Sequence, residues 1–407
     1  MKSGKKLSIL LISATYPPST NGVAVLVGNV FSELTRRGME VYLLAPEGDK
    51  KVKDPKNIIR YPSVPNPYLK DYRFPLLPLN QKIIQLLTKK RFDIVHAHHP
   101  FQISFMADVV SSLNNIPFIY TYHTFLDKYI GIYLKFLPKK LTSFIASYTG
   151  TGVFGKADLI IVPSKSVKRR LSRFGVKKNI VVLPVGTPKF ESPKESKQSL
   201  RKKYGLPLQK TCLLCVSRIG KEKNLKLLVD SMKYLPEKYV LVIAGMGPYM
   251  GELKNLVKKK NLENRVFLIG KVVYSKINEV YCLGDIFVFP SLTETQGLVF
   301  LEASYFGLPT VAVESAVNRE WVRGEFGIVS KNIPKDFATA ILKASKNKSQ
   351  LGKKAKQFAA SFTIDKTTKE LINIYQNTIS SYNQKKPLSL IKERFFEFQK
   401  HIIGKGF

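Results

Sequence analysis

The sequence predicts an α/β protein with two doubly wound parallel-sheet domains that face a cleft. Three observations carry this prediction: the length of 407 residues, two successive series of alternating strand-like and helix-like segments, and a polar stretch between the series. A chain of this length exceeds what one hydrophobic core usually serves, so we expect two domains.

The first half contains six short apolar runs that we interpret as strands: LSILLIS, EVYLLAP, FDIVHAH, PFIYTY, DLIIVPS and NIVVLP. Helical patterns lie between several of them, for example VAVLVGNVFSELTRRG, which Gly38 ends. Short strands that alternate with helices are typical of βαβ units and therefore of parallel sheets.

The second half repeats the alternation, with strands expected at TCLLCVSR, YVLVIAG, RVFLIG, DIFVFPS and PTVAV. The helices expected between them include LKLLVDSMKYL, MGELKNLVKKKNL and GLVFLEASYFG. Residues 186–200, GTPKFESPKESKQSL, are polar and contain two prolines, so we interpret them as the linker. Open parallel sheets bind ligands at the carboxyl ends of their strands, which places the expected site between the domains.

Bulk composition narrows the class of partner. Lysine and arginine number 66 against 29 acidic residues, a net charge of +37. Such a charge favours nucleic acid, an anionic membrane face or phosphorylated ligands, although a lysine-rich proteome would also account for it. RNA-recognition motifs are absent, which argues against nucleic acid. No run of about 18 apolar residues occurs, so we expect no membrane span.

Cysteines and histidines are interpreted structurally. The C-x-x-C of Cys212 and Cys215 lies within an apolar run, so a buried strand is favoured over a metal or redox site. His96, His98 and His99 invite a zinc interpretation, but no Cys or Glu stands at metal spacing, and strand-end packing with loop hydrogen bonds is favoured.

Two loops have the composition of an anion site. In SRIGKEKN, Arg218 and Lys223 flank the turn after a strand, where two cations beside a helix N-terminus suit a diphosphate. Two solvated basic residues would give the same pattern. In STNGVAVL, Gly22 either exposes backbone amides to an anion or simply makes a turn.

The stretch SLTETQGLVFLEASYFG carries two carboxylates, Glu294 and Glu302, on either side of a strand-to-helix turn. Amides near Gly297 and Leu298 would point toward an anion. We interpret Glu302 as a ligand of a ribose and Glu294 as a ligand of a hexose, because carboxylates accept hydrogen bonds from hydroxyl pairs. A general acid and base, or a capping acid with a surface acid, remain alternatives.

Taken together, NGVAVLVGNVFSELTRRGMEVYLLAP, HAHHPF, YTYHT, SRIGKEKN, VIAGMGP and SLTETQGLVFLEAS resemble the retaining GT-B glycosyltransferases of family 4 (GT4) up to about residue 380. The resemblance implies two Rossmann-like domains. Residues 1–188 would bind the acceptor, residues 200–365 would bind a nucleotide sugar, and helices in 366–407 would cross back to the first domain.

The resemblance also implies roles for individual residues. Arg218 and Lys223 match the pair on the donor diphosphate, and Glu294 and Glu302 match the carboxylates on the hexose and the ribose. Gly297, with Leu298 beside it, matches the glycine whose neighbouring amides bind phosphate. Gly22 matches the glycine of the loop that faces donor and acceptor, and His123 matches the histidine near the reacting centre.

YTYHTFLDKY and TETQG look like segments of the diacylglycerol glucosyltransferases and, more distantly, of phosphatidylinositol mannosyltransferases. PVGT (184–187) departs from the N-G-V-D of many relatives. The expected reaction is transfer of glucose from UDP-glucose to a lipid such as diacylglycerol. A soluble or polymer-linked glycan, phosphatidylinositol with GDP-mannose, and a non-enzymatic polyanion binder remain alternatives.

Two stretches are candidates for membrane contact. Residues 126–148 combine apolar residues at helical spacing with lysines, and residues 388–402 form a second amphipathic pattern. A helix packed on the protein competes with each interpretation. We expect a cytoplasmic enzyme that is peripheral to the inner membrane face and has no cofactor. We also expect no metal, because no D-x-D occurs. The oligomeric state is left open.

Overall fold

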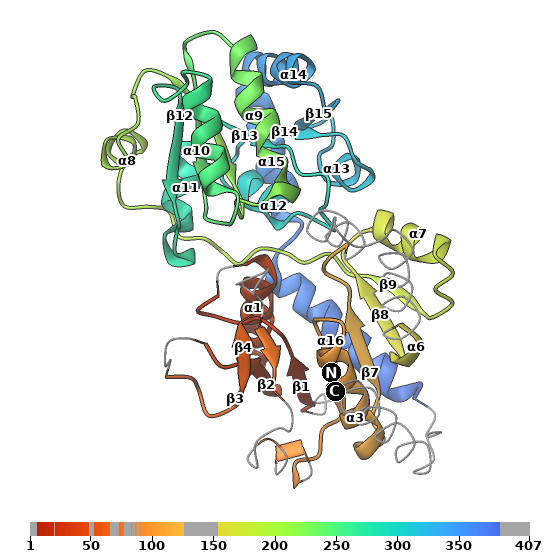
Figure 1. Cartoon of the computed structure of the whole chain (residues 1–407). Coiled ribbons are helices and arrows are strands. Elements are labelled where there is room, and N and C mark those ends of the chain that lie inside the picture. The colour runs from red at the N-terminus through yellow and green to blue at the C-terminus, as the bar shows by residue number, and fades with distance from the viewer. Residues whose placement is uncertain are drawn as a thin grey trace, which may run out of the picture.

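Figure 1 presents the chain as a computed structural model, which describes residues 6–19, 21–48, 53–65, 73–76, 83, 86–87, 89–125 and 154–382. Two parallel sheets, each built from one half of the chain, account for most strands in these residues. The predicted fold class is therefore confirmed. The candidate membrane stretches 126–148 and 388–402 lie outside the described residues.

In the described residues, the first sheet has seven strands: β3 (Ile58–Tyr61), β2 (Glu40–Pro46), β1 (Ser8–Ile12), β6 (Ile94–Ala97), β7 (Phe118–Thr121), β8 (Leu159–Val162) and β9 (Ile180–Val182). This order reverses between β1 and β6. Every residue of β1 is buried, which explains why its sequence is continuously apolar rather than alternating. The helices α1 (Gly22–Arg36), α3 (Gln102–Asn114) and α7 (Lys165–Arg173) connect these strands.

The second sheet orders its six described strands as β12 (Val266–Gly270), β11 (Tyr239–Ala244), β10 (Thr211–Val216), β13 (Ile286–Phe289), β14 (Thr310–Val313) and β15 (Gly327–Ser330). Its order reverses between β10 and β13. Cys212 and Cys215 are buried and unbridged in β10, as the strand interpretation predicts. The connecting helices include α9 (Leu225–Ser231), α10 (Met250–Lys259), α11 (Ile277–Leu283), α12 (Leu298–Tyr305), α13 (Ala316–Trp321), α14 (Pro334–Lys346) and α15 (Lys348–Ala360).

The sequence interpretation missed two strands, β3 and β15, which lie at an edge of each sheet. β3 reads IIRY and β15 reads GIVS, so each carries polar or small residues within only four positions. Both are edge strands, which pair on one side only and so tolerate such residues, whereas the edge strands β9 and β12 keep apolar runs and were predicted. An antiparallel pair, β4 (Ser63–Pro65) with β5 (Arg73–Pro75), was also not foreseen.

The long helix α16 (Ile364–Ser380) follows the second sheet in sequence but packs on the first (Figure 1). Leu371 and Tyr375 are buried in the same hydrophobic cluster as β1 and α1. At the start of α16, Asp365 pairs with Arg36 and Arg37 at the end of α1. The domain limits 1–188, 200–365 and 366–407 stay a prediction, with which this packing of α16 is compatible.

Candidate active site

The predicted site residues come from loops at the carboxyl ends of strands, close to the points where the strand order reverses. Gly22 follows β1, and His123 follows β7. In the second sheet, Arg218 follows β10 and Glu294 follows β13, the two strands that flank the reversal. These are the positions at which open α/β sheets bind ligands.

The two cations of the predicted diphosphate site are both paired with carboxylates. Arg218 Nη1 lies 2.9 Å from Glu222 Oε1, and Lys223 Nζ lies 2.6 Å from Glu294 Oε1. The Glu222 side chain is fully buried beneath the turn. A Cβ atom at Gly220 would lie 2.1 Å from Glu222 Oε2, so with any other residue at position 220 this carboxylate would have to move.

Glu294 is held from two sides. Its Oε1 accepts hydrogen bonds from Lys223 Nζ and from Ser291 Oγ, each at 2.6 Å. The Glu294 and Lys223 side chains are 14 % and 13 % exposed, so the charges are shielded from most of the solvent that would weaken their attraction. Glu294 and Lys223, chosen separately from the sequence, therefore contact each other directly.

Gly297 precedes helix α12 with a left-handed backbone, at φ +79°. A Cβ atom there would lie 2.8 Å from the ring of Phe300, so both the backbone and the space require glycine. No side chain caps the first turn of α12. Leu298, the first residue of the helix, packs against the hydrophobic cluster of the first sheet. The start of α12 therefore lies at the junction of the two sheets.

Glu302 lies deeper in α12 and is buried. Its Oε2 accepts a 2.6 Å hydrogen bond from the Tyr281 hydroxyl, and its Oε1 a 3.4 Å bond from the Tyr274 hydroxyl. Burial raises the pKa of Tyr274, and the nearby side chain of Asn29 on α1, across the junction, acts in the opposite direction. Burial raises the pKa of the Glu302 carboxyl group, and the two hydroxyls act in the opposite direction. Neither tyrosine was foreseen from the sequence.

His123 belongs to a chain of histidines from β6 and β7. Its Nε2 lies 3.0 Å from His98 Nδ1, and the two rings stack at 5.3 Å. His98 also lies 4.2 Å from the His96 ring, and His96 bonds Tyr375 and Thr121. Burial lowers the pKa of His123 to about 3, so the ring is neutral at ordinary pH. These bonds agree with the packing interpretation of the histidines.

Gly22 is the first residue of helix α1. Asn21 caps the N-terminus of this helix, because its side chain accepts a hydrogen bond from the Ala24 amide. A Cβ atom at Gly22 would meet nothing within 4 Å. The fold itself therefore gives no reason for glycine at this position. This leaves room for the role that the family resemblance implies, the close approach of a ligand.

The loops of the two sheets meet directly beside these residues. The Thr295 hydroxyl donates a 2.8 Å hydrogen bond to the backbone carbonyl of His123, which places the neighbour of Glu294 against the first domain. In the described part of the chain, no group of three or more His, Cys, Asp or Glu side chains is arranged to hold a metal ion. Nor does any helix of the described ranges have the length and apolarity to cross a membrane.

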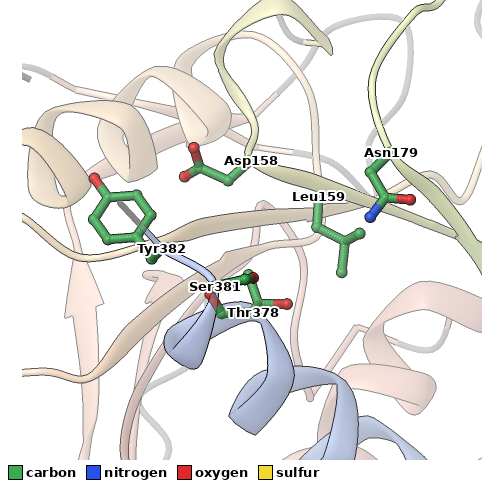
Figure 2. A pocket seen from close by; sticks show the side chains of 6 residues that line it. All are labelled: Asp158, Leu159, Asn179, Thr378, Ser381 and Tyr382. Atoms are coloured by element: carbon green, nitrogen blue, oxygen red, sulfur yellow. Dashed lines mark hydrogen bonds between the residues drawn. The ribbon is translucent and has the colours of Figure 1, made fainter. Parts of the chain in front are cut away.

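A polar pocket of about 260 Å³ lies elsewhere and contains none of the predicted site residues (Figure 2). It is lined by Asp158 and Leu159 at the start of β8, by Asn179 just before β9, and by Thr378, Ser381 and Tyr382 at the end of α16. These strand residues mark the amino ends of the sheet, opposite to the loops described above. By the rule for parallel sheets, this pocket is not the place to expect the ligand.

Comparison with known proteins gives a family. Residues 20–188 match the family described as Glycosyltransferase Family 4, and residues 196–361 match the family described as Glycosyl transferases group 1. The α-monoglucosyldiacylglycerol synthase of Streptococcus pneumoniae is 32 % identical over 316 residues, which cover 75 % of this chain and 71 % of that protein. The α-monoglucosyldiacylglycerol synthase of Acholeplasma laidlawii is 29 % identical over 325 residues, covering 75 % and 80 %.

Solved structures with the same fold span nearly the whole chain. Sucrose-phosphate synthase from Thermosynechococcus elongatus superposes with a TM-score of 0.74 at 18 % identity, covering 92 % of this chain and 100 % of that one. Anabaena Alr3699/HepE in complex with UDP-glucose gives a TM-score of 0.73 at 17 % identity, covering 91 % and 100 %. The fold is thus the GT-B arrangement of two Rossmann-like sheets, and the chain belongs to glycosyltransferase family 4.

Proposed function

We propose that this glycosyltransferase moves glucose from UDP-glucose to the hydroxyl of a membrane lipid, diacylglycerol in the first instance, to form an α-glycolipid. The observation that carries the proposal is the 2.6 Å contact between Lys223 and Glu294, the residues proposed to bind the diphosphate and the hexose. The acceptor is proposed from the two relatives named as α-monoglucosyldiacylglycerol synthases.

The donor is proposed to bind along the second domain. Lys223 and Arg218 take the diphosphate together with the first-turn amides of α12 at Gly297 and Leu298, Glu294 takes hydroxyls of the hexose, and Glu302 takes the ribose. The barrier lies in breaking the anomeric C–O bond while negative charge grows on the diphosphate. Two fixed cations and a helix N-terminus stabilise that charge without reorganising during the reaction.

The first domain is proposed to supply the acceptor side, through Gly22 and His123. Because Nε2 of the neutral His123 ring is engaged with His98 Nδ1, the other ring nitrogen, Nδ1, is left for a hydrogen bond to a sugar hydroxyl, which suits sugar binding rather than charge stabilisation. Retention by front-side attack, in which the leaving phosphate takes the acceptor proton, is what the family resemblance implies. In this mechanism Glu294 is a sugar ligand and not a nucleophile, and no metal is required.

We propose further that the enzyme works as a peripheral protein on the inner face of the cell membrane, where its acceptor lies. The net charge of +37 supports attraction to anionic lipid, which adds on the order of 1 kcal/mol for each basic residue near the surface. Sedimentation with anionic and neutral vesicles at low and high salt tests this localisation separately from catalysis.

The function is tested by offering the purified enzyme UDP-glucose, UDP-galactose, UDP-GlcNAc and GDP-mannose, each with diacylglycerol or phosphatidylinositol in vesicles. The proposal expects glucosyl-diacylglycerol from UDP-glucose, with the α-linkage. Mannosyl transfer from GDP-mannose to phosphatidylinositol, or transfer only to a soluble glycan, would contradict the proposed donor and acceptor while leaving the family intact.

A further inference from the structure

The two residues after Glu294 bind the first domain rather than their own. The Thr295 hydroxyl donates to the backbone carbonyl of His123 at 2.8 Å, and the Thr295 carbonyl accepts from Ser164 Oγ at 2.8 Å. The Gln296 carboxamide pairs with the backbone of Val185 in both directions, accepting from its amide at 2.9 Å and donating to its carbonyl at 2.6 Å. These residues are buried except for His123, which is partly buried.

The three contacts anchor one short segment to three separate loops. His123 follows β7, Ser164 follows β8 and Val185 follows β9, so the carboxyl ends of three successive strands are all engaged. Because these hydrogen bonds go mainly to backbone groups, they depend on the position of the main chain of the first domain. They can all form together only in one relative placement of the two sheets.

Gln296 is suited to this contact by its chemistry. The backbone of one residue offers one N–H donor and one C=O acceptor. The planar carboxamide of glutamine carries a matching acceptor and donor in fixed geometry, so it can bond to both. A glutamate of the same shape would place a carboxylate oxygen against the Val185 carbonyl and lose one bond. Buried groups left unpaired in this way are costly, so the pair is sensitive to a single-atom change.

We propose that Thr295 and Gln296 are positioning residues for transfer, which hold Glu294 of the donor side and His123 of the acceptor side in register. This inference rests on the proposed function of those two residues. Thr295 hydrogen-bonds the backbone of His123 and directly follows Glu294 in the chain. One hydrogen bond and one peptide bond therefore connect the proposed donor residue Glu294 to the proposed acceptor-side residue His123. Displacing reacting groups by about 1 Å can lower turnover about 100-fold.

The test uses four variants in the full-length enzyme. Thr295→Val and Gln296→Glu keep the shape and remove one bond each, Gln296→Glu also adds a negative charge, and Thr295→Ser keeps the hydroxyl. Glu320→Gln is the matched control, because Glu320 Oε1 and Oε2 accept from the Lys165 and Ser166 amides at 2.8 Å, also across the junction but not through His123 or Glu294. For each variant, kcat, donor KM, calorimetric affinity for UDP-glucose and Tm are measured.

Thr295→Val and Gln296→Glu are expected to lower kcat about 10- to 100-fold. Thr295→Val, which adds no charge beside Gly297, should keep an affinity for UDP-glucose close to that of the wild type, because the second domain holds the donor. Thr295→Ser and Glu320→Gln should retain kcat. Unchanged kcat in the first two variants, or an equal loss of kcat in Glu320→Gln, overturns the inference, because the residues would then be ordinary contacts between domains.

A readout without sugar separates this inference from the proposed function. If the wild-type enzyme neither binds nor transfers glucose, the proposed function is wrong. Small-angle scattering can still compare the radius of gyration of the variants with that of the wild type. An increased radius of gyration in Gln296→Glu and not in Glu320→Gln supports the positioning contact, whereas identical scattering profiles contradict it.

Discussion

Lys223 Nζ lies 2.6 Å from Glu294 Oε1, although the two residues are 71 positions apart in the chain. They come from the loops after β10 and β13, which are neighbours in the second sheet. A donor diphosphate that engages Lys223 therefore approaches the carboxylate proposed to hold its sugar. This proximity links leaving-group stabilisation to hexose recognition.

Replacing Lys223 or Glu294 by alanine should lower turnover roughly 100-fold or more, because each change removes a fixed partner of the donor near the breaking bond. Initial rates of transfer with saturating acceptor measure the effect, and circular dichroism verifies that each variant stays folded. The control is Lys226→Ala, since Lys226 is exposed and pairs with Asp230 on the helix surface. Wild-type rates in Lys223→Ala or Glu294→Ala would remove the site assignment.

Tyr274→Phe should lower the donor KM by a few-fold. The Tyr274 hydroxyl takes up a position at Glu302 Oε1 that the proposed ribose contact needs, and one hydrogen bond is worth about 1 kcal/mol. The matched change, Tyr281→Phe, removes the shorter bond to Glu302 Oε2 and should instead cost about 1–3 kcal/mol of unfolding free energy. A higher donor KM in Tyr274→Phe would mean that the hydroxyl assists donor binding rather than competing with it.

Gly22→Ala should keep the melting temperature of the wild type and lose activity. A Cβ atom at position 22 meets no protein atom within 4 Å, so any loss must come from a ligand that approaches the backbone. Gly28→Ala on the same helix is the control, since its Cβ would make only ordinary contacts of 3.8 Å with Tyr16 and Pro17. Full activity in Gly22→Ala would show that Gly22 only forms a turn and is not approached by a ligand.

The four buried or partly buried histidines of the first domain predict that the stability of the protein depends on pH. Burial lowers the pKa values of His96, His99 and His123 to about 3, and that of His98 well below 6.5. Between pH 6.5 and about pH 3 the unfolded chain therefore binds protons that the folded chain does not. The stability associated with the neutral rings is complete above pH 6.5 and is lost as the pH falls below it.

Urea unfolding at pH 7.5, 6.5, 5.5 and 4.5 measures this dependence. The unfolding free energy should decrease at each step below pH 6.5, with a slope that can exceed 1 kcal/mol per pH unit because several groups act together. A constant free energy between pH 6.5 and 4.5 would show that the histidines are accessible to protons. The same pKa values predict no histidine titration in kcat between pH 6 and 8.

The fold could be predicted from the sequence where burial dictates composition. The central strand β13, and β10 after Thr211, are apolar because both faces are covered. The edge strands β3 and β15 escaped because each has only four residues and includes polar or small ones, namely the half-exposed Arg60 in β3 and the buried Gly327 and Ser330 at the ends of β15. Gly297 was recognisable by its place between a strand and a helix, and the structure adds the positive φ that requires it.

The site was predictable only as separate residues. Glu294, Lys223 and His123 stand beside strand ends, which sequence patterns can locate. The partners of the site residues cannot be located in this way. Tyr274 lies near Asn29, and Thr295 hydrogen-bonds the backbone of His123, although the residues of each pair are more than 170 positions apart in the chain. Such pairings depend on how two sheets are placed against each other, and no local pattern encodes that placement.

The central claim is that Lys223, Arg218 and the carboxylates Glu294 and Glu302 bind a nucleoside-diphosphate sugar. Isothermal titration calorimetry of the wild-type enzyme with UDP-glucose tests it most directly, with Lys223→Ala titrated in parallel. We predict saturable binding at one site per chain, displaced by UDP and strongly weakened in Lys223→Ala. Absence of binding for every UDP- and GDP-linked sugar, or equal affinity in Lys223→Ala, would contradict the claim.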